Sequence, residues 1–114
     1  MGVSFTVGQD FDVIAELTAW ADRDAAGERE TALALARLTV VSKHGIGEAR
    51  ADVWSPPDLF MFNAGRLSVI YAARTRRGGA NVLVLYACDM RRAKSAASFE
   101  AEAKRRLEAT ESWE

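Results

Sequence analysis

Basic side chains are concentrated between residues 66 and 94, around two apolar segments. This stretch holds seven basic residues against a single acid, Asp89: Arg66, Arg74, Arg76, Arg77, Arg91, Arg92 and Lys94. Cations fixed at the ends of a rigid sheet can bind the phosphates of a polyanion such as nucleic acid. A solvated hairpin tip accounts equally well for the three middle arginines. The last three cations directly follow the second apolar segment, a position from which they could hold phosphate.

Few other side chains offer chemistry. Tyr86 lies in the second apolar segment, where a core tyrosine with its hydroxyl at a strand end is the simplest interpretation. His44 is expected to cap the end of a helix, and Cys88 to pack inertly in apolar sequence. With one cysteine the chain can form no internal disulfide, and with one histidine it has little from which to build a zinc site. The chain also carries no phosphate-binding glycine loop.

The elements that must position these side chains begin with the two apolar segments themselves. Residues 67–73 and 82–87 are continuous apolar runs of strand length, rich in β-branched and aromatic residues. Such runs predict strands that are covered on both faces. The segment between them, Arg74 to Gly79, is predicted to be a hairpin connection because its two glycines can adopt positive φ.

The first half of the chain predicts one short strand and two helices. Alternation over residues 3–7 predicts the strand. Asp10 is expected to cap the first helix. The apolar stripe of that helix comprises Val13, Ile14, Leu17, Trp20 and Ala21. Asp22 or Asp24 would cap the second, longer helix, which is expected to end at Gly45.

The second half predicts further strands and one last helix. Residues 49–54 are a weak strand candidate, and residues 59–62 are a stronger one that turns into the first apolar segment. A final helix starts near Ser95 or Ser98 and docks on the sheet through one face. That face carries Phe99, Ala103 and Leu107. The order of elements indicates an α+β fold: a small, mostly antiparallel sheet with two N-terminal helices and a C-terminal helix.

Length and composition describe one soluble globular domain spanning residues 1–114. The 114 residues are 49% apolar and 27% charged, enough to bury a core without metal or disulfide staples. No run predicts a transmembrane helix, the first residues do not resemble a signal peptide, and the single cysteine fits a reducing cytoplasm. Residues 1–60 carry five basic and ten acidic side chains (−5), and residues 61–114 carry ten basic and six acidic (+4), which gives the net charge of −1. This asymmetry is compatible with a basic face that meets nucleic acid.

Four stretches of the second half form a recognisable pattern. They are residues 59–63, residues 65–71, residues 84–94 and residues 103–107. In this order they resemble the RelE/HigB-like toxins of bacterial type II toxin–antitoxin systems, in particular the phage-associated branch. That branch carries a Leu-Trp-Glu-Leu-Arg-type strand end, an Arg-Val-x-Tyr-type strand, a Leu-Leu-His-x-Phe-x-Lys-Lys segment and an Ala-x-x-Arg helix.

The resemblance implies a RelE/ParE-like fold and a metal-independent endoribonuclease, without cofactor, that cleaves mRNA on the ribosome. It also implies a cognate antitoxin, of the helix-turn-helix kind, that docks over the sheet. Catalytic roles would fall to Tyr86, which stands at the usual histidine position, and to Arg91 and Arg92. Nucleic-acid contacts would come from Arg66, Arg74, Arg76, Arg77 and Lys94.

Two departures from the family pattern concern the chemistry. Active members usually carry arginine at two positions where this chain has Asn63 and Ser68, which supply no positive charge. Arg66, or Arg91 with Arg92, could substitute. Two other interpretations therefore stay open. One is a catalytically silent interaction protein on the same fold, such as a phage-derived inhibitor of a host protein. The other is a ParE-like toxin that poisons a topoisomerase by binding.

Overall fold

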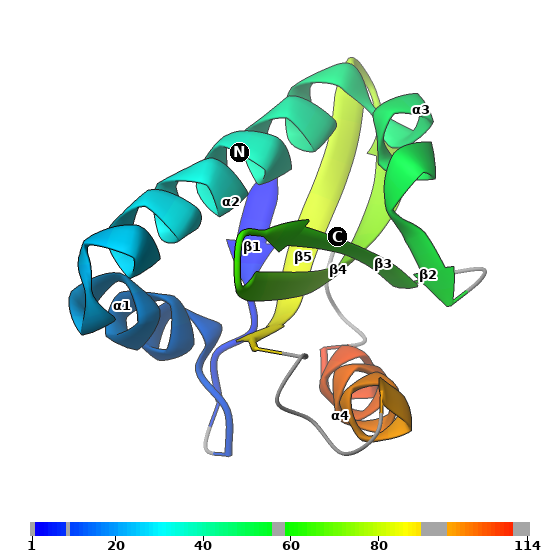
Figure 1. Cartoon of the computed structure of the whole chain (residues 1–114). Coiled ribbons are helices and arrows are strands. Elements are labelled where there is room, and N and C mark those ends of the chain that lie inside the picture. Colours follow the sequence, from blue (N-terminus) through cyan, green and yellow to red (C-terminus); the bar gives the residue numbers. More distant parts are fainter. Residues whose placement is uncertain (1, 9, 56–58, 90–95, 111–114) are drawn as a thin grey trace.

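A computed structural model describes residues 2–8, 10–55, 59–89 and 96–110 as an α+β fold (Figure 1). The elements follow in the order β1 (Val3–Phe5), α1 (Val13–Arg23), α2 (Ala25–His44), α3 (Ile46–Ala49), the 3-10 helix η1 (Arg50–Asp52), β2 (Val53–Ser55), β3 (Leu59–Ala64), β4 (Leu67–Arg76), β5 (Gly79–Cys88) and α4 (Ala96–Glu108). The α+β class predicted from the sequence is confirmed.

The sheet has five strands in the order β1-β5-β4-β3-β2. β2 to β5 form consecutive antiparallel pairs, whereas β1 lies parallel to β5, with Val3 opposite Val82. The long β4–β5 hairpin is therefore central, and β1 and β2 are the edges. A parallel pair needs a long connection, and here the chain between β1 and β5 includes α1, α2 and the other strands.

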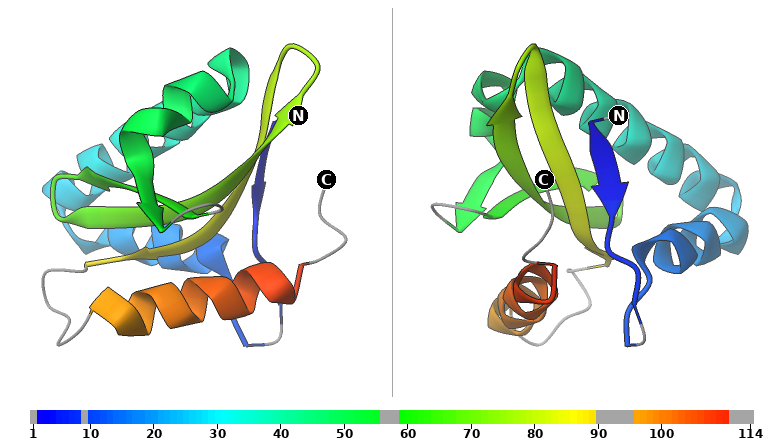
Figure 2. Two further views of the ribbon diagram at one scale, coloured as in Figure 1. Left: turned by 90° about the vertical axis from the view of Figure 1, so that its right-hand side faces the viewer. Right: turned by 180° about the vertical axis from the view of Figure 1, so that it is seen from behind.

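Helices lie on both faces of the sheet (Figure 2). α1 and α2 pack on one face, in a core that includes Leu38 and Val69. α4 packs on the other face, in a second core that includes Ala103 and Ile70. Val69 and Ile70 are neighbours in β4, enter opposite cores and are both 0% exposed. The first apolar segment is thus a strand covered on both faces, as its composition predicts.

β5 carries a one-residue bulge at Leu85. Ile70 pairs with Tyr86 and Tyr71 pairs with Val84, so that Leu85 has no partner of its own on β4. A bulge interrupts the regular alternation of side chains along a strand. Val84 belongs to the core under α1 and α2, whereas Leu85 and Tyr86 both join the core under α4. The bulge therefore turns Tyr86 toward α4, because strict alternation after Leu85 would place it on the opposite face.

Capping residues fix the ends of the two long N-terminal helices. α1 is capped by Asp12, whose Oδ1 accepts a hydrogen bond from the backbone N–H of Ala15 at 3.2 Å. The expectation that Asp10 caps this helix is wrong, because the capping residue directly precedes the first helical residue. Asp24 caps α2, and Gly45, with a φ of 92°, ends it.

Two predicted boundaries also differ from the structure. Residues 49–52 are helical, so that only the last residues of the predicted 49–54 strand pair in the sheet, as β2. The hairpin connection is shorter than predicted, because Arg74 and Arg76 belong to β4 and only residues 77 and 78 form the turn. Gly78 has a φ of 79°, which suits a two-residue hairpin turn.

Candidate functional site

Tyr86 lies near the C-terminal end of β5, between the sheet and α4. Its ring meets that of Phe99 edge-to-face, with the ring centroids 5.5 Å apart. The guanidinium carbon of Arg106 lies 4.3 Å from the centroid of the same ring. Tyr86 is half-buried in this position. The predicted catalytic tyrosine is therefore held between an aromatic ring and an arginine, both from α4.

Arg106 joins three elements around Tyr86. It is 5% exposed, and its guanidinium donates to the carboxylates of Glu16 in α1 at 3.0 Å and of Glu102 in α4 at 2.9 Å. It also donates to the carbonyl oxygen of Leu85, the bulge residue, at 2.9 Å. A buried charge is tolerated when it is paired and hydrogen-bonded. Arg106 meets both conditions, and in doing so it ties α1, α4 and the bulge together.

The surroundings of Tyr86 favour its protonated form. Burial raises the pKa of its hydroxyl above the ordinary value, and the nearby Cys88 and Glu16 act in the same direction, whereas Arg106 opposes them. Burial likewise raises the pKa of the Cys88 thiol to about 12. At neutral pH both groups keep their protons. Tyr86 can thus act as a proton donor rather than a base, and Cys88 is not a thiolate nucleophile.

Arg66, predicted to contact nucleic acid, binds carboxylates within the fold. Its guanidinium lies 2.9 Å from Oε1 of Glu30, which belongs to α2, and 2.9 Å from Oδ1 of Asp24, which caps α2. Glu30 is 7% exposed and also accepts a hydrogen bond from the indole of Trp20 at 3.1 Å. The hydrogen bonds from Arg66 lower the pKa of Glu30 to about 2. If Arg66 moved to bind phosphate, a buried carboxylate would lose its cation.

The two positions at which RelE/HigB-like toxins usually carry arginine are neighbours across β3 and β4. Asn63 pairs with Ser68, and the Ser68 hydroxyl donates to Asn63 Oδ1 at 2.7 Å. Ser68 is 1% exposed. These two side chains therefore satisfy each other and bring no charge to the surface of the sheet.

The remaining predicted cations fall into two groups. Three of them are exposed at the tip of the β4–β5 hairpin: Arg74, Arg76 and Arg77. Tyr86 is seven residues from Gly79 along β5, a separation of roughly 20 Å at the rise of a strand. The fold therefore does not bring the hairpin arginines to Tyr86. The other three cations lie outside the described residues: Arg91, Arg92 and Lys94.

Sequence reasoning missed Arg106 and Glu16 as members of the Tyr86 site. A signal for Arg106 existed, because it falls three residues after Ala103 and seven after Phe99, on the apolar face of α4. An arginine on a buried face must find a partner. That partner could not be identified, since Glu16 lies 90 positions away in the chain.

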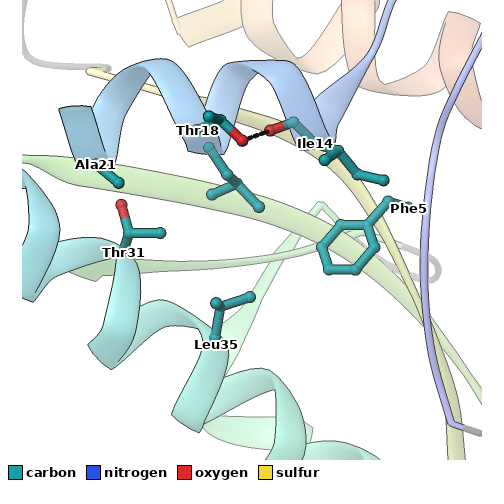
Figure 3. Close-up of a pocket in the computed structure, with 7 residues that line it drawn as sticks. Phe5, Ile14, Thr18, Ala21, Thr31 and Leu35 are labelled. Carbon is teal, nitrogen blue, oxygen red and sulfur yellow. Dashed lines mark hydrogen bonds between the residues drawn. The ribbon is translucent and has the colours of Figure 1, made fainter. Parts of the chain in front are cut away.

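An apolar hollow of about 360 Å³ opens between α1, α2 and β1 (Figure 3). It is lined by Phe5, Ile14, Leu17, Thr18, Ala21, Thr31 and Leu35. The hydroxyls of Thr18 and Thr31 donate to carbonyl groups of their own helices at 2.8 and 2.9 Å. The hollow therefore suits an apolar group and contributes nothing to proton transfer.

Among the described residues, no group of three or more His, Cys, Asp or Glu could hold a metal ion. No helix in the described ranges is long and apolar enough to cross a membrane.

Comparison with known proteins gives no match. No protein-family model matches the chain, no curated protein matches its sequence, and no solved structure matches its fold.

Proposed function

We propose that this chain is a RelE/HigB-like toxin that cleaves mRNA on the ribosome, with Tyr86 as the proton donor. The observation that carries the proposal is the bulge at Leu85, which turns Tyr86 toward α4 and sets its ring 4.3 Å from the Arg106 guanidinium. Bulges are over-represented next to active sites, where they re-aim a side chain. The fold class and the central antiparallel hairpin agree with this assignment.

In the proposed reaction a ribose 2′-hydroxyl oxygen attacks the adjacent phosphorus and releases its proton to solvent. The bond between phosphorus and the 5′-oxygen of the next nucleotide breaks, which leaves a 2′,3′-cyclic phosphate and a 5′-hydroxyl. Tyr86 gives its proton to the leaving 5′-oxygen, a role that suits a hydroxyl protonated at neutral pH. Cations must stabilise the charge on the transition-state phosphate. Arg91, Arg92 and Lys94, which follow Tyr86 in the chain, are the proposed source.

A cognate antitoxin is the proposed partner. The central strands β4 and β5 pack against α1 and α2 on one face and against α4 on the other. Docking over the sheet therefore stays a prediction, with these helices beside the segment that would dock. The proposed contact surfaces are the edge strands β1 and β2 and the apolar hollow beside β1.

A catalytically silent interaction protein on the same fold is the second candidate. It is favoured by the state of the polar residues at the expected cation positions: Asn63 and Ser68 bond to each other, and Arg66 is held by Glu30. In this case Tyr86 only packs against Phe99, and the protein acts by binding a host protein, such as a topoisomerase.

Primer extension in cells separates the two candidates. The chain is expressed together with a reporter message and with a matched message that lacks its ribosome-binding site. The proposed toxin arrests growth and produces new 5′ ends in the translated message alone. Growth arrest without new 5′ ends supports the silent interaction protein. Equal cleavage of both messages contradicts ribosome dependence, and neither arrest nor cleavage contradicts both candidates.

A further inference from the structure

The outer face of α2 is exposed and uncharged over its middle turns. Between residues 31 and 42 six side chains are exposed, and none of them is charged: Ala32, Leu33, Leu35, Ala36, Thr39 and Val40. Arg37, the charged residue of this interval, is half-buried and pairs with Glu48 and Asp52. Among the described elements, none lies over α2 on the side away from the sheet (Figures 1 and 2). The outer face of a surface helix is ordinarily charged or polar, so this one is suited to a contact.

Part of this face forms a stripe whose two ends carry opposite charges. At helical spacing the stripe joins an acid in the first turn of α2, four uncharged residues and a base in the last turn. We call these exposed residues the α2 stripe: Glu28, Ala32, Leu35, Ala36, Thr39 and Lys43. The Thr39 hydroxyl donates to the carbonyl oxygen of Leu35 at 2.8 Å, so that its hydrogen bond is made within the helix. The middle of the stripe can therefore be covered by an apolar surface.

The apolar hollow of Figure 3 borders the middle of the α2 stripe. Leu35 lines this hollow together with Ile14 of α1. Leu35 is 40% exposed and Ile14 is 51% exposed, although both are large apolar side chains. An aliphatic side chain placed over Leu35 would fill the hollow and remove both residues from water, which favours association.

We propose that the α2 stripe joins two copies of this chain in an antiparallel dimer. The stripe is symmetric about the point between Leu35 and Ala36, as a two-fold interface requires, because the same patch then faces itself. If the helices cross at this point, Lys43 of each copy lies opposite Glu28 of the other. The small side chains of Ala32 and Ala36 at the crossing let the helix axes approach to about 8 Å. Leu35 of each copy then lies over the hollow of the other.

Charge favours a second copy in the antiparallel direction. In a parallel pair Glu28 would face Glu28 and Lys43 would face Lys43, whereas the antiparallel pair matches both charges and opposes the helix dipoles. The contact uses one helix from each copy, so we expect a weak dimer with a Kd on the order of 10 µM. This dimer goes beyond the proposed function and does not require cleavage of RNA. An antitoxin that docks in the same hollow would compete with the second copy.

Sedimentation equilibrium of the full chain, without RNA and over concentrations that bracket this Kd, tests the contact. Ala36→Glu places a carboxylate of each copy at the crossing, and Ala101→Glu makes the same change at an exposed position of α4. We expect Ala36→Glu to raise the Kd at least about tenfold, because like charges would face each other, and Ala101→Glu to change it less than about twofold. Leu35→Gln, with Leu33→Gln outside the stripe as its control, repeats the comparison if Ala36→Glu lowers the melting temperature.

A charge exchange tests the antiparallel direction. Glu28→Lys and Lys43→Glu are each expected to raise the Kd about fivefold, because each variant sets like charges against each other at both ends of the contact. The double variant Glu28→Lys/Lys43→Glu restores opposite charges and should return the Kd to within about twofold of the wild-type value. Circular dichroism checks that α2 is retained, since both changes oppose its dipole.

Three results would overturn the proposal. A wild-type chain that stays monomeric over the whole range leaves this face to a different partner. Equal weakening by Ala36→Glu and Ala101→Glu shows a general charge effect, and a double variant that associates no more tightly than the single variants excludes the antiparallel contact. Because association is measured without RNA, a chain that dimerises but does not cleave mRNA contradicts the proposed function alone.

Discussion

Arg106 fixes the position of the Tyr86 ring. Its guanidinium lies beside the tyrosine ring and also binds the carbonyl oxygen of the bulge residue Leu85. Because Arg106 is 5% exposed and its charge is met by Glu16 and Glu102, it holds the site in shape rather than contacting a substrate. We therefore assign it a positioning role.

Replacing Arg106 tests this role. Arg106→Gln leaves Glu16 and Glu102 without their shared cation, and we expect the free energy of unfolding to fall by about 3 kcal/mol. Arg106→Lys keeps the charge and should recover part of the loss. Urea unfolding measures each change. The control is Arg105→Gln, which breaks a surface pair with Glu102 and an exposed contact with the Phe11 ring and should cost less than about 1 kcal/mol. Equal effects at positions 105 and 106 would refute the buried network.

The two tyrosines of the chain have different environments. The Tyr71 hydroxyl is buried under α2 and donates to Asp52 at 2.6 Å, and Asp52 is in turn paired with Arg37 at 2.9 Å. Burial raises the pKa of Tyr71 as well. Tyr71 is 0% exposed, whereas Tyr86 is half-buried at the end of its strand. The chain thus contains one tyrosine that is part of the core and one that can reach a ligand.

At the scale of elements, ion pairs hold α2 to the sheet and stabilise α4. Arg66 in the β3–β4 turn pairs with Glu30 of α2, whereas Arg105 and Arg106 pair with Glu102 within α4. Hydrogen bonds from these arginines lower the pKa of each carboxyl group to about 2, against the opposing effect of burial. Both carboxylates are therefore more acidic in the folded than in the unfolded chain.

The depressed pKa values fix the direction of a pH dependence. A carboxyl group whose pKa is lowered in the folded state stabilises the fold at pH values above its pKa in the unfolded chain, about 4.3. It loses this contribution as the pH falls toward the folded-state pKa of about 2. We expect the melting temperature to fall steadily between about pH 4.5 and pH 2. Glu30→Gln should melt lower at neutral pH and show a shallower acid slope. Differential scanning calorimetry measures both, and a melting temperature that does not change over this range would contradict the ion-pair assignment.

Much of the element pattern could be predicted from the sequence because burial follows residue type. The apolar segments became the central strands β4 and β5, and the seam of Phe99, Ala103 and Leu107 docks in the core under α4. The bulge at Leu85 could not be predicted, since nothing in the run from residue 82 to residue 87 interrupts its apolar character. The parallel pairing of β1 with β5 likewise depends on tertiary packing, and the three residues of β1 do not predict it.

The candidate site could be predicted only in part from the sequence. The resemblance predicts Tyr86 because this residue stands at the usual histidine position, and the structure gives it a half-buried position with a nearby cation. The basic stretch predicts a nucleic-acid contact for Arg66, and its pairing with Glu30 could not be predicted because Glu30 lies 36 positions away. The sequence places the hairpin arginines and Tyr86 in one basic stretch, whereas the structure places them near opposite ends of the β4–β5 hairpin.

Across the whole molecule, charge and apolar surface are distributed over different elements. The first sixty residues carry the net charge of −5 and include α1, α2 and the lining of the apolar hollow. The exposed arginines of the β4–β5 hairpin lie at one end of that hairpin, and Tyr86 lies near the other.

The central claim is that Tyr86 donates a proton to the leaving oxygen, and removal of one oxygen atom tests it most directly. Tyr86→Phe keeps the ring that packs on Phe99 and Arg106, so that the fold is retained. Tyr71→Phe is the matched control, because it removes the same atom from the core and costs roughly 1–3 kcal/mol of stability through Asp52.

Primer extension on a translated message, with soluble protein levels matched by immunoblot, gives the result. We predict that Tyr86→Phe lowers cleavage by about 10²–10⁴-fold, whereas Tyr71→Phe retains cleavage in proportion to its folded fraction. Cleavage by Tyr86→Phe at the wild-type rate would contradict the account.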